Sequence, residues 1–142
     1  MMSDITGGCL CGAVRFCYAG PLGGAVGAVT VCHCAKCRKA QGYAAAVAPA
    51  LAAGFQVTSG AGEIREFQSS PGKFRAFCAA CGSPLYSRLE AAPERLRLRL
   101  GALDDPPATL TIDAHTFTEG VPAWSVSGDA APRYAGREPG RP

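Results

Sequence analysis

The stretch at residues 77–86 reads FCAACGSPLY, and its CAAC core spaces two cysteines for one metal ion. The glycine that follows can take a backbone conformation that a Cβ would hinder, so the turn aims both thiolates at the same point. Two more thiols are needed for a tetrahedral site. The CLC motif offers them, since residues i and i+2 of a strand project to the same side. We therefore predict a structural zinc site that fixes the sheet, made of Cys9, Cys11, Cys78 and Cys81.

A second group of cysteines lies in the stretch VCHCAKCRKAQG at residues 31–42. Cys32, Cys34 and Cys37 can reach one ion, and no fourth thiol lies nearby in the sequence. Structural zinc is normally four-coordinate, whereas catalytic zinc keeps three protein ligands and one open position. Soft thiolates favour zinc over magnesium or calcium, although copper(I) or iron also fits the spacing. The two groups predict two zinc ions per chain, one in a closed site and one in an open site.

Two further residues bear on whether the second site is open. Cys17 belongs to neither group, so it either completes the second site or is a buried apolar thiol. His33 lies between two of the expected ligands and, in an extended segment, points away from them, which favours packing or hydrogen bonding. Disulfides are disfavoured because cytosolic thiols stay reduced and seven of the 8 cysteines form tight groups.

The periodicity of the chain predicts short strands. Its length of 142 residues suits one domain with its own core. Apolar and polar residues alternate at residues 14–18 and again at residues 110–114, as in half-buried strands. A short helix is predicted at residues 38–41, ended by the glycine that follows. We expect a mainly β, mostly antiparallel domain with little helix over residues 1–126, then an irregular, loosely packed tail at residues 127–142.

Composition and charge exclude several classes of function. No run of about 20 apolar residues could cross a membrane. The start, MMSDITGG, lacks a signal-peptide pattern, so we expect a cytoplasmic protein. Seven thiolates with two zinc ions would cancel the formal net charge of +3, so we expect no nucleic-acid partner. The stretch RLRLRL at residues 95–100 predicts a strand whose arginine face is exposed to solvent, in preference to a phosphate-binding surface.

The order of the motifs resembles the glutathione-dependent formaldehyde-activating enzyme family, also called the GFA or CENP-V/GFA domain family. The resemblance covers almost the whole chain and includes residues around the cysteines. The matching segments are GGCLCGAVRF at residues 7–16, CHCAKCRKAQG at 32–42, FCAACGSPLY at 77–86, GALDDP at 101–106 and AHTFTEGVPAW at 114–124.

The resemblance implies a zinc-stabilised fold of the β-tent type, with two zinc ions per chain. It implies carbon–sulfur lyase activity, in which glutathione and formaldehyde combine to S-hydroxymethylglutathione. The partners would then be a small-molecule thiol, glutathione, and an aldehyde. The structural zinc would be held by Cys9, Cys11, Cys78 and Cys81, and the catalytic zinc by Cys32, Cys34 and Cys37. Basic side chains that could receive the glutathione carboxylates are Lys36, Arg38, Lys39 and Lys73.

Two other functions fit the same cysteines. A structural zinc module that binds a protein partner would hold two four-coordinate ions and expose an apolar patch. A redox or metal-handling protein would hold a labile ion and oxidise the thiols of the second group reversibly. The pattern carries no signal for an oligomeric state.

Overall fold

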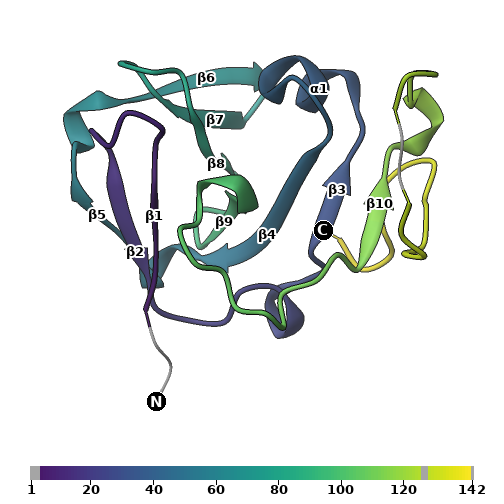
Figure 1. The fold of residues 1–142 in the computed structure, drawn as a ribbon, viewed down its shortest axis with the longest axis horizontal. Coiled ribbons are helices and arrows are strands. Elements are labelled where there is room, and N and C mark those ends of the chain that lie inside the picture. Colours follow the sequence, from purple (N-terminus) through teal and green to yellow (C-terminus); the bar gives the residue numbers. More distant parts are fainter. Residues whose placement is uncertain (1–3, 126–127, 142) are drawn as a thin grey trace.

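The computed structural model describes residues 4–125 and 128–141, and the chain is mainly β, as predicted (Figure 1). A three-stranded sheet has the order β1-β2-β5, and a seven-stranded sheet has the order β10-β3-β4-β9-β8-β7-β6. The strands are β1 (Ile5–Gly8), β2 (Arg15–Tyr18), β3 (Thr30–Cys32), β4 (Ala45–Leu51), β5 (Phe55–Ser59), β6 (Ile64–Ser70), β7 (Lys73–Cys78), β8 (Pro84–Leu89), β9 (Arg95–Arg99) and β10 (Ala114–Thr116).

Helical structure is limited to short pieces. The α-helix α1 (Ala35–Gln41) connects β3 to β4. Short 3₁₀ turns occupy Gly24–Val26, Ala52–Gly54, Ala61–Glu63, Leu100–Ala102 and Thr118–Gly120. Over residues 4–125 and 128–141, no helix combines the length and the apolar character that a bilayer crossing requires.

Most strand pairs are antiparallel, as predicted, but β10 pairs with β3 in parallel. Parallel neighbours need a long crossover connection. Here that connection is most of the domain, because the chain builds β4 to β9 before it returns beside β3. The edge strand on this side of the seven-stranded sheet is therefore β10, which comes from a distant part of the sequence.

Two local predictions need correction. The strand expected at residues 110–114 is wrong except at its last residue: Leu110 packs against the core without a ladder partner, and β10 begins only at Ala114. The helix expected at residues 38–41 begins earlier, at Ala35, because the Cys34 sulfur caps its first turn by accepting the Cys37 N–H. It ends as predicted at a left-handed glycine.

The core lies between the two sheets. Phe16 and Tyr18 of β2 are almost fully buried, as their alternation predicts, and they face the seven-stranded sheet. Leu85 of β8 and Leu98 of β9 are the largest buried side chains on that side. Each such side chain stabilises the fold by about 1.5–3 kcal/mol relative to exposure.

The chain beyond β10 is irregular but packed more closely than its composition suggests. It runs beside β10 at the edge of the molecule (Figure 1). Backbone hydrogen bonds link His115 N to Pro132 O at 2.8 Å, Thr118 N to Tyr134 O at 3.0 Å and Phe117 N to Gly136 O at 2.9 Å. We call residues 132–141 the C-terminal strap.

Candidate metal centres

The structure brings together all four cysteines of the predicted structural site, which we call the four-cysteine cluster: Cys9, Cys11, Cys78 and Cys81. Their sulfurs all lie within 4.8 Å of one another. The Cys11 Sγ is 3.6 Å from the Cys9 Sγ and 3.9 Å from the Cys78 Sγ. Four sulfurs bound at about 2.3 Å to one tetrahedral zinc would stand about 3.8 Å apart. These separations therefore fit a tetrahedral metal site.

The first pair of cysteines lies in the turn between β1 and β2. The prediction that Cys9 and Cys11 lie within a strand is wrong, because β1 ends at Gly8. The turn is closed by a 3.1 Å hydrogen bond from Cys9 N to Val14 O, and Gly12 turns the chain with a φ of 81°. The Val14 N–H also donates to the Cys9 sulfur at 3.2 Å, so the backbone orients this ligand.

The second pair spans the start of the turn between β7 and β8: Cys78 ends β7, and Cys81 lies in the turn. Cys78 N donates to Ser83 O at 3.0 Å, and Gly82 turns the chain with a φ of 80°. The Cys81 sulfur lies 3.2 Å from the Ser83 hydroxyl, and this hydrogen bond is the main reason that the pKa of Cys81 falls to about 5. The cluster thus joins two hairpins that belong to different sheets.

Cys32, Cys34 and Cys37 form the three-cysteine cluster, with sulfurs also within 4.8 Å of one another. Cys32 ends β3, Cys34 caps α1, and Cys37 lies in the first turn of the helix. The strand end and the helix start therefore present the three thiols to one point. Among residues 4–125 and 128–141, no fourth histidine, cysteine, aspartate or glutamate joins this group.

Two arginines lie near the three-cysteine cluster: Arg75, which the sequence analysis did not single out, and Arg99, whose charge interacts with all three thiols of the cluster. Arg75 of β7 places Nη1 and Nη2 at 3.6 Å and 3.7 Å from the Cys37 sulfur, while its Nε donates to Ser69 Oγ at 2.9 Å. The pKa of Cys37 is lowered by hydrogen bonds from the other two thiols of the cluster and by Arg75. Arg99 of β9 is only 4% exposed. The sequence signal that could have indicated Arg75 is the alternation of Lys73 and Arg75 just before the CAAC motif, which places both basic side chains on one face of a strand.

Replacing Arg75 with methionine is expected to weaken metal binding at the three-cysteine cluster by about 10- to 100-fold, as when an outer partner of a metal ligand is removed. The guanidinium offsets the negative charge of three thiolates, and methionine keeps much of its volume without the charge. Competition with a zinc chelator measures the loss. The matched control is Arg65→Met on β6, because within the described residues Arg65 donates to the nearby backbone carbonyls of Gly62 and Ile64. Equal affinity in Arg75→Met and wild type would contradict this role.

Neither Cys17 nor His33 lies among the ligands of the three-cysteine cluster. Cys17 is on β2 in the other sheet, opposite Thr6 of β1. His33 is buried, and its Nε2 lies 2.8 Å from His115 Nδ1. His115 Nε2 in turn lies 2.9 Å from both carboxylate oxygens of Asp129. The carboxylate accepts from His115 Nε2–H, so His115 Nδ1 accepts from His33 Nε2–H.

The arginine face of the RLRLRL stretch is not the solvent-exposed surface that the sequence analysis predicted. Leu96 and Leu98 are buried on one side of β9, as expected. On the other side Arg97 is half-buried and Arg99 is buried. Burial, together with repulsion from Arg141, lowers the pKa of Arg97 to about 10. The arginine side of β9 is partly shielded from solvent, because the strap and the neighbouring strands lie around it.

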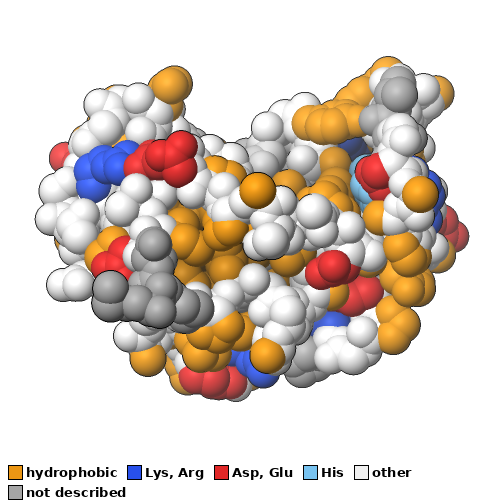
Figure 2. Space-filling model, turned by 60° about the horizontal axis from the view of Figure 1, so that its bottom comes forward, with side chains coloured by type: hydrophobic (Ala, Val, Ile, Leu, Met, Phe, Trp, Pro, Cys, Tyr) orange, Lys and Arg blue, Asp and Glu red, His pale blue; other side chains and the backbone are white. Residues whose placement is uncertain are grey.

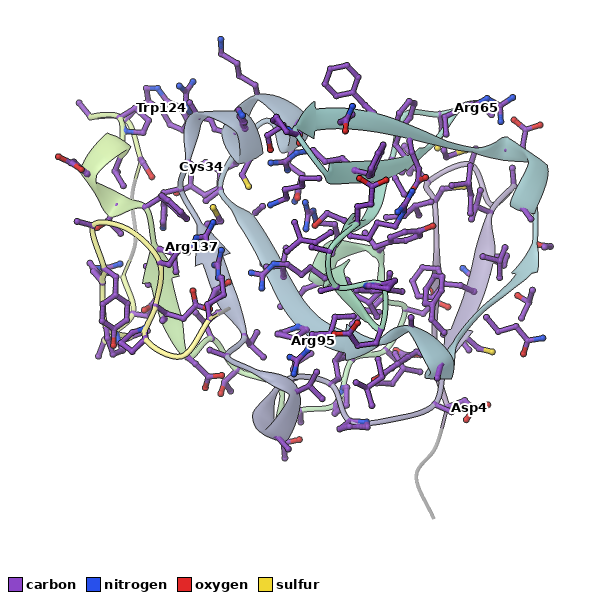
Figure 3. All side chains as sticks on the ribbon, turned by 180° about the vertical axis from the view of Figure 1, so that it is seen from behind. Asp4, Cys34, Arg65, Arg95, Trp124 and Arg137 are labelled. Carbon is purple, nitrogen blue, oxygen red and sulfur yellow. The ribbon has the colours of Figure 1, made fainter. Side chains whose placement is uncertain are left out.

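The candidate residues for glutathione carboxylates fall into two groups. Lys36 and Lys39 are exposed on α1, and Arg38 on the same helix is partly buried, with its Nε lacking a hydrogen-bond partner among the described residues. Lys73 is half-buried and lines a pocket on the same side of the sheet as Arg97. Figure 3 shows Cys34 beside α1, with Arg137 on the same side of the view and Arg65 on the opposite side. Arg95 and Arg137 line the same pocket.

Comparisons with known proteins agree with this architecture. Residues 4–120, most of the chain, match the family described as glutathione-dependent formaldehyde-activating enzyme. A crystal structure of a Rhodobacter sphaeroides protein is similar at 25% identity and a TM-score of 0.59, over 72% of this chain and 91% of that one. No curated protein matches the chain. The match over residues 4–120 shows that the chain belongs to the glutathione-dependent formaldehyde-activating enzyme family.

Proposed function

We propose that the chain is a zinc-dependent carbon–sulfur lyase that joins a thiol, glutathione, to formaldehyde or a related aldehyde. The observation that carries this proposal is the three-cysteine cluster, in which three converging sulfurs have no fourth described ligand. Three protein ligands leave one position of a tetrahedral ion for a substrate. The four-cysteine cluster would hold a second, structural zinc.

The donor set suits zinc, since thiolates are soft ligands. Zinc, when bound, would supply the positive charge that favours a substrate thiol in its thiolate form at neutral pH. Cys32, Cys34 and Cys37 would hold the ion, and Arg75 would balance the charge of the thiolates.

The reaction itself forms one carbon–sulfur bond. The thiolate sulfur attacks the aldehyde carbon, the carbonyl π-electrons move to oxygen, and that oxygen takes the proton that the thiol released. The product is a hemithioacetal, the S-hydroxymethyl adduct in the case of formaldehyde. The reverse reaction, which breaks the carbon–sulfur bond, is the lyase reaction. Arg75 and Arg99 would supply positive charge on the side where the oxygen becomes negative.

The test is zinc content per chain, with X-ray absorption at the zinc edge, on wild type, Cys34→Ser and Cys17→Ser. We expect wild type and Cys17→Ser to hold two zinc ions and Cys34→Ser to hold one while remaining folded. Excess glutathione should add one sulfur to one of the two zinc ions of wild type, which raises the average from about 3.5 to about 4 sulfur ligands per zinc, and should leave the average of Cys34→Ser unchanged.

Cys17→Ser is the control for cysteine loss, because Cys17 lies in the other sheet. Two results would overturn the proposal: loss of a zinc ion in Cys17→Ser, or an unchanged wild-type spectrum with saturating glutathione. Either would mean that both sites are closed.

A further inference from the structure

A pocket of about 550 Å³ lies over the arginine side of β9. Its volume is within the usual range for small-molecule sites, about 300–1,000 Å³. Six basic residues line it and Glu138 is the one acidic lining residue among those described. Few basic side chains show on the face drawn in Figure 2, whereas the pocket gathers many. The basic residues are Lys73, Arg88, Arg95, Arg97, Arg137 and Arg141.

The pocket and the three-cysteine cluster share one side of the seven-stranded sheet. On β7, Lys73 lines the pocket and Arg75, two residues on, contacts the Cys37 sulfur. On β9, Arg97 lines the pocket and Arg99 is likewise two residues further along the strand. Residues i and i+2 of a strand project to the same side. Both strands therefore carry positive charge continuously from the pocket to the thiols.

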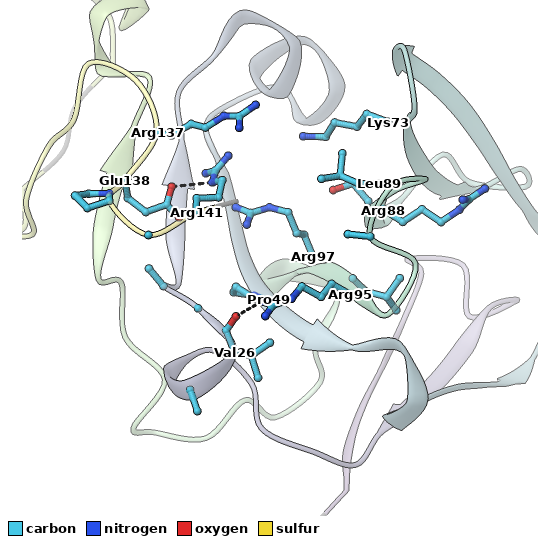
Figure 4. Close-up of a pocket in the computed structure, with 18 of the residues that line it drawn as sticks. Val26, Pro49, Lys73, Arg88, Leu89, Arg95, Arg97, Arg137, Glu138 and Arg141 are labelled. Carbon is cyan, nitrogen blue, oxygen red and sulfur yellow. Dashed lines mark hydrogen bonds and ion pairs between the residues drawn. The ribbon is translucent and has the colours of Figure 1, made fainter.

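The pocket also brings Arg97 close to the C-terminal strap. Arg97 donates to Thr30 Oγ1 at 3.0 Å, two residues before the first thiol of the three-cysteine cluster. The guanidinium groups of Arg97 and Arg141 meet inside the pocket, with Arg137 and Lys73 above them on opposite sides (Figure 4). Repulsion from Arg141 contributes to the lowered pKa of Arg97.

Arg141 is incompletely satisfied by the protein. Its Nε lies 2.8 Å from Glu138 Oε1 as an ion pair, but the two atoms are not aligned for a hydrogen bond. Its Nη2 is buried and has no hydrogen-bond partner among the described residues. A buried N–H of a charged group without a partner is costly. Arg97 and Arg141 both line the pocket, so an anion bound there would reduce the repulsion between the two guanidinium groups.

We propose that the pocket binds an oxyanionic group, carboxylate or phosphate, at the far end of the substrate whose sulfur reaches the three-cysteine cluster. This inference rests on the proposed function. Arg97 and Arg141 bind the oxyanion, Lys73 adds positive charge, and the row of Arg75 and Arg99 leads from this anchor to the thiols. The strap lies outside residues 4–120, so two of the six basic lining residues, Arg137 and Arg141, come from beyond the part that matches the family.

The experiment is calorimetric titration of the zinc-loaded full chain with glutathione and with glutathione diethyl ester, whose carboxylates are blocked. Arg97→Gln and Arg141→Gln should each weaken glutathione binding by about 10- to 100-fold, as expected for lost charged hydrogen bonds. The ester should bind weakly to wild type and be insensitive to both variants. Arg141→Lys should retain part of the affinity. The control is Arg65→Gln, which lies away from the pocket and should bind glutathione like wild type (Figure 3).

Competition identifies the source of the oxyanion. Displacement of glutathione from wild type by glutarate alone would assign the pocket to carboxylates, and displacement by inorganic phosphate would assign it to phosphates. In both cases Arg97→Gln should abolish the competition. Equal binding of glutathione and its ester, or wild-type affinity in both glutamine variants with unchanged thermal melts, would overturn the inference.

The two proposals fail separately. If glutathione still adds a sulfur to zinc while both glutamine variants bind it normally, the lyase proposal stands and the anchor is wrong. If the variants lose affinity but zinc gains no sulfur, the anion subsite stands and the lyase proposal is wrong.

Discussion

The Cys78→Ser variant is expected to lose one zinc ion and its cooperative unfolding transition. Cys78 is fully buried at the end of β7, and its sulfur lies 3.9 Å from the Cys11 sulfur, 67 residues away in the chain. Structural zinc contributes about 10–16 kcal/mol in small zinc-binding peptides. That is as large as the whole stability of a typical domain, about 5–15 kcal/mol. Elemental analysis and thermal unfolding followed by circular dichroism measure both effects.

The size of this effect follows from what the four-cysteine cluster connects. The cluster holds the β1–β2 hairpin against the β7–β8 hairpin, and these belong to separate sheets. The polar tie near it is weaker, since Asp104 pairs with Arg15 and accepts from Thr6 at an exposed position. Cys17→Ser is the control and should keep both the zinc and the transition. Two zinc ions and an unchanged melting temperature in Cys78→Ser would show that the cluster is not structural.

The Gly60→Ala variant is expected to lose about 2–5 kcal/mol of unfolding free energy, from left-handed backbone strain and overpacking together. Gly60 has a φ of 77°, and a Cβ there would lie 1.9 Å from the Ala13 carbonyl oxygen and 3.0 Å from the Val14 Cα. Both contacts are backbone atoms, so no side chain can move aside. The displaced segment includes the Val14 N–H that donates to the Cys9 sulfur. Urea denaturation measures the loss of stability.

Gly62→Ala is the matched control, because a Cβ at Gly62 would meet no atom within 4 Å. It should leave the midpoint of denaturation within experimental error of wild type. Gly60→Ala should also weaken zinc binding at the four-cysteine cluster, since it displaces the turn that carries Cys9. If both alanine variants unfold at the wild-type midpoint, the close approach of Gly60 to Ala13 does not constrain this turn.

The exposed aromatic residues near the end of the family-matched region do not explain the function. Trp124 is 58% exposed and stacks on Tyr43 with ring centroids 5.7 Å apart. Trp124 follows β10, whereas Tyr43 lies in the short connection between α1 and β4. The chemistry is better explained by the thiols and the basic side chains.

The sequence by itself determined the composition of both cysteine clusters, the mainly β class and the burial of Phe16, Tyr18 and Leu98. The reason is that these signals are local. Cysteines two or three residues apart can reach one ion wherever the segment lies in the fold, and a period of two defines one face of a strand.

Only the tertiary structure decided which parts of the chain lie against the polar side of each strand. The arginine side of β9 faces the strap, whose Arg141 lines the same pocket as Arg97, and the chain of His33, His115 and Asp129 joins segments from three parts of the sequence. Cys9 and Cys11 lie in the turn between β1 and β2, and the two cysteines that complete their cluster come from the other sheet. Such contacts depend on which strands become neighbours, and that choice minimises the free energy of the whole chain, so no local pattern encodes it.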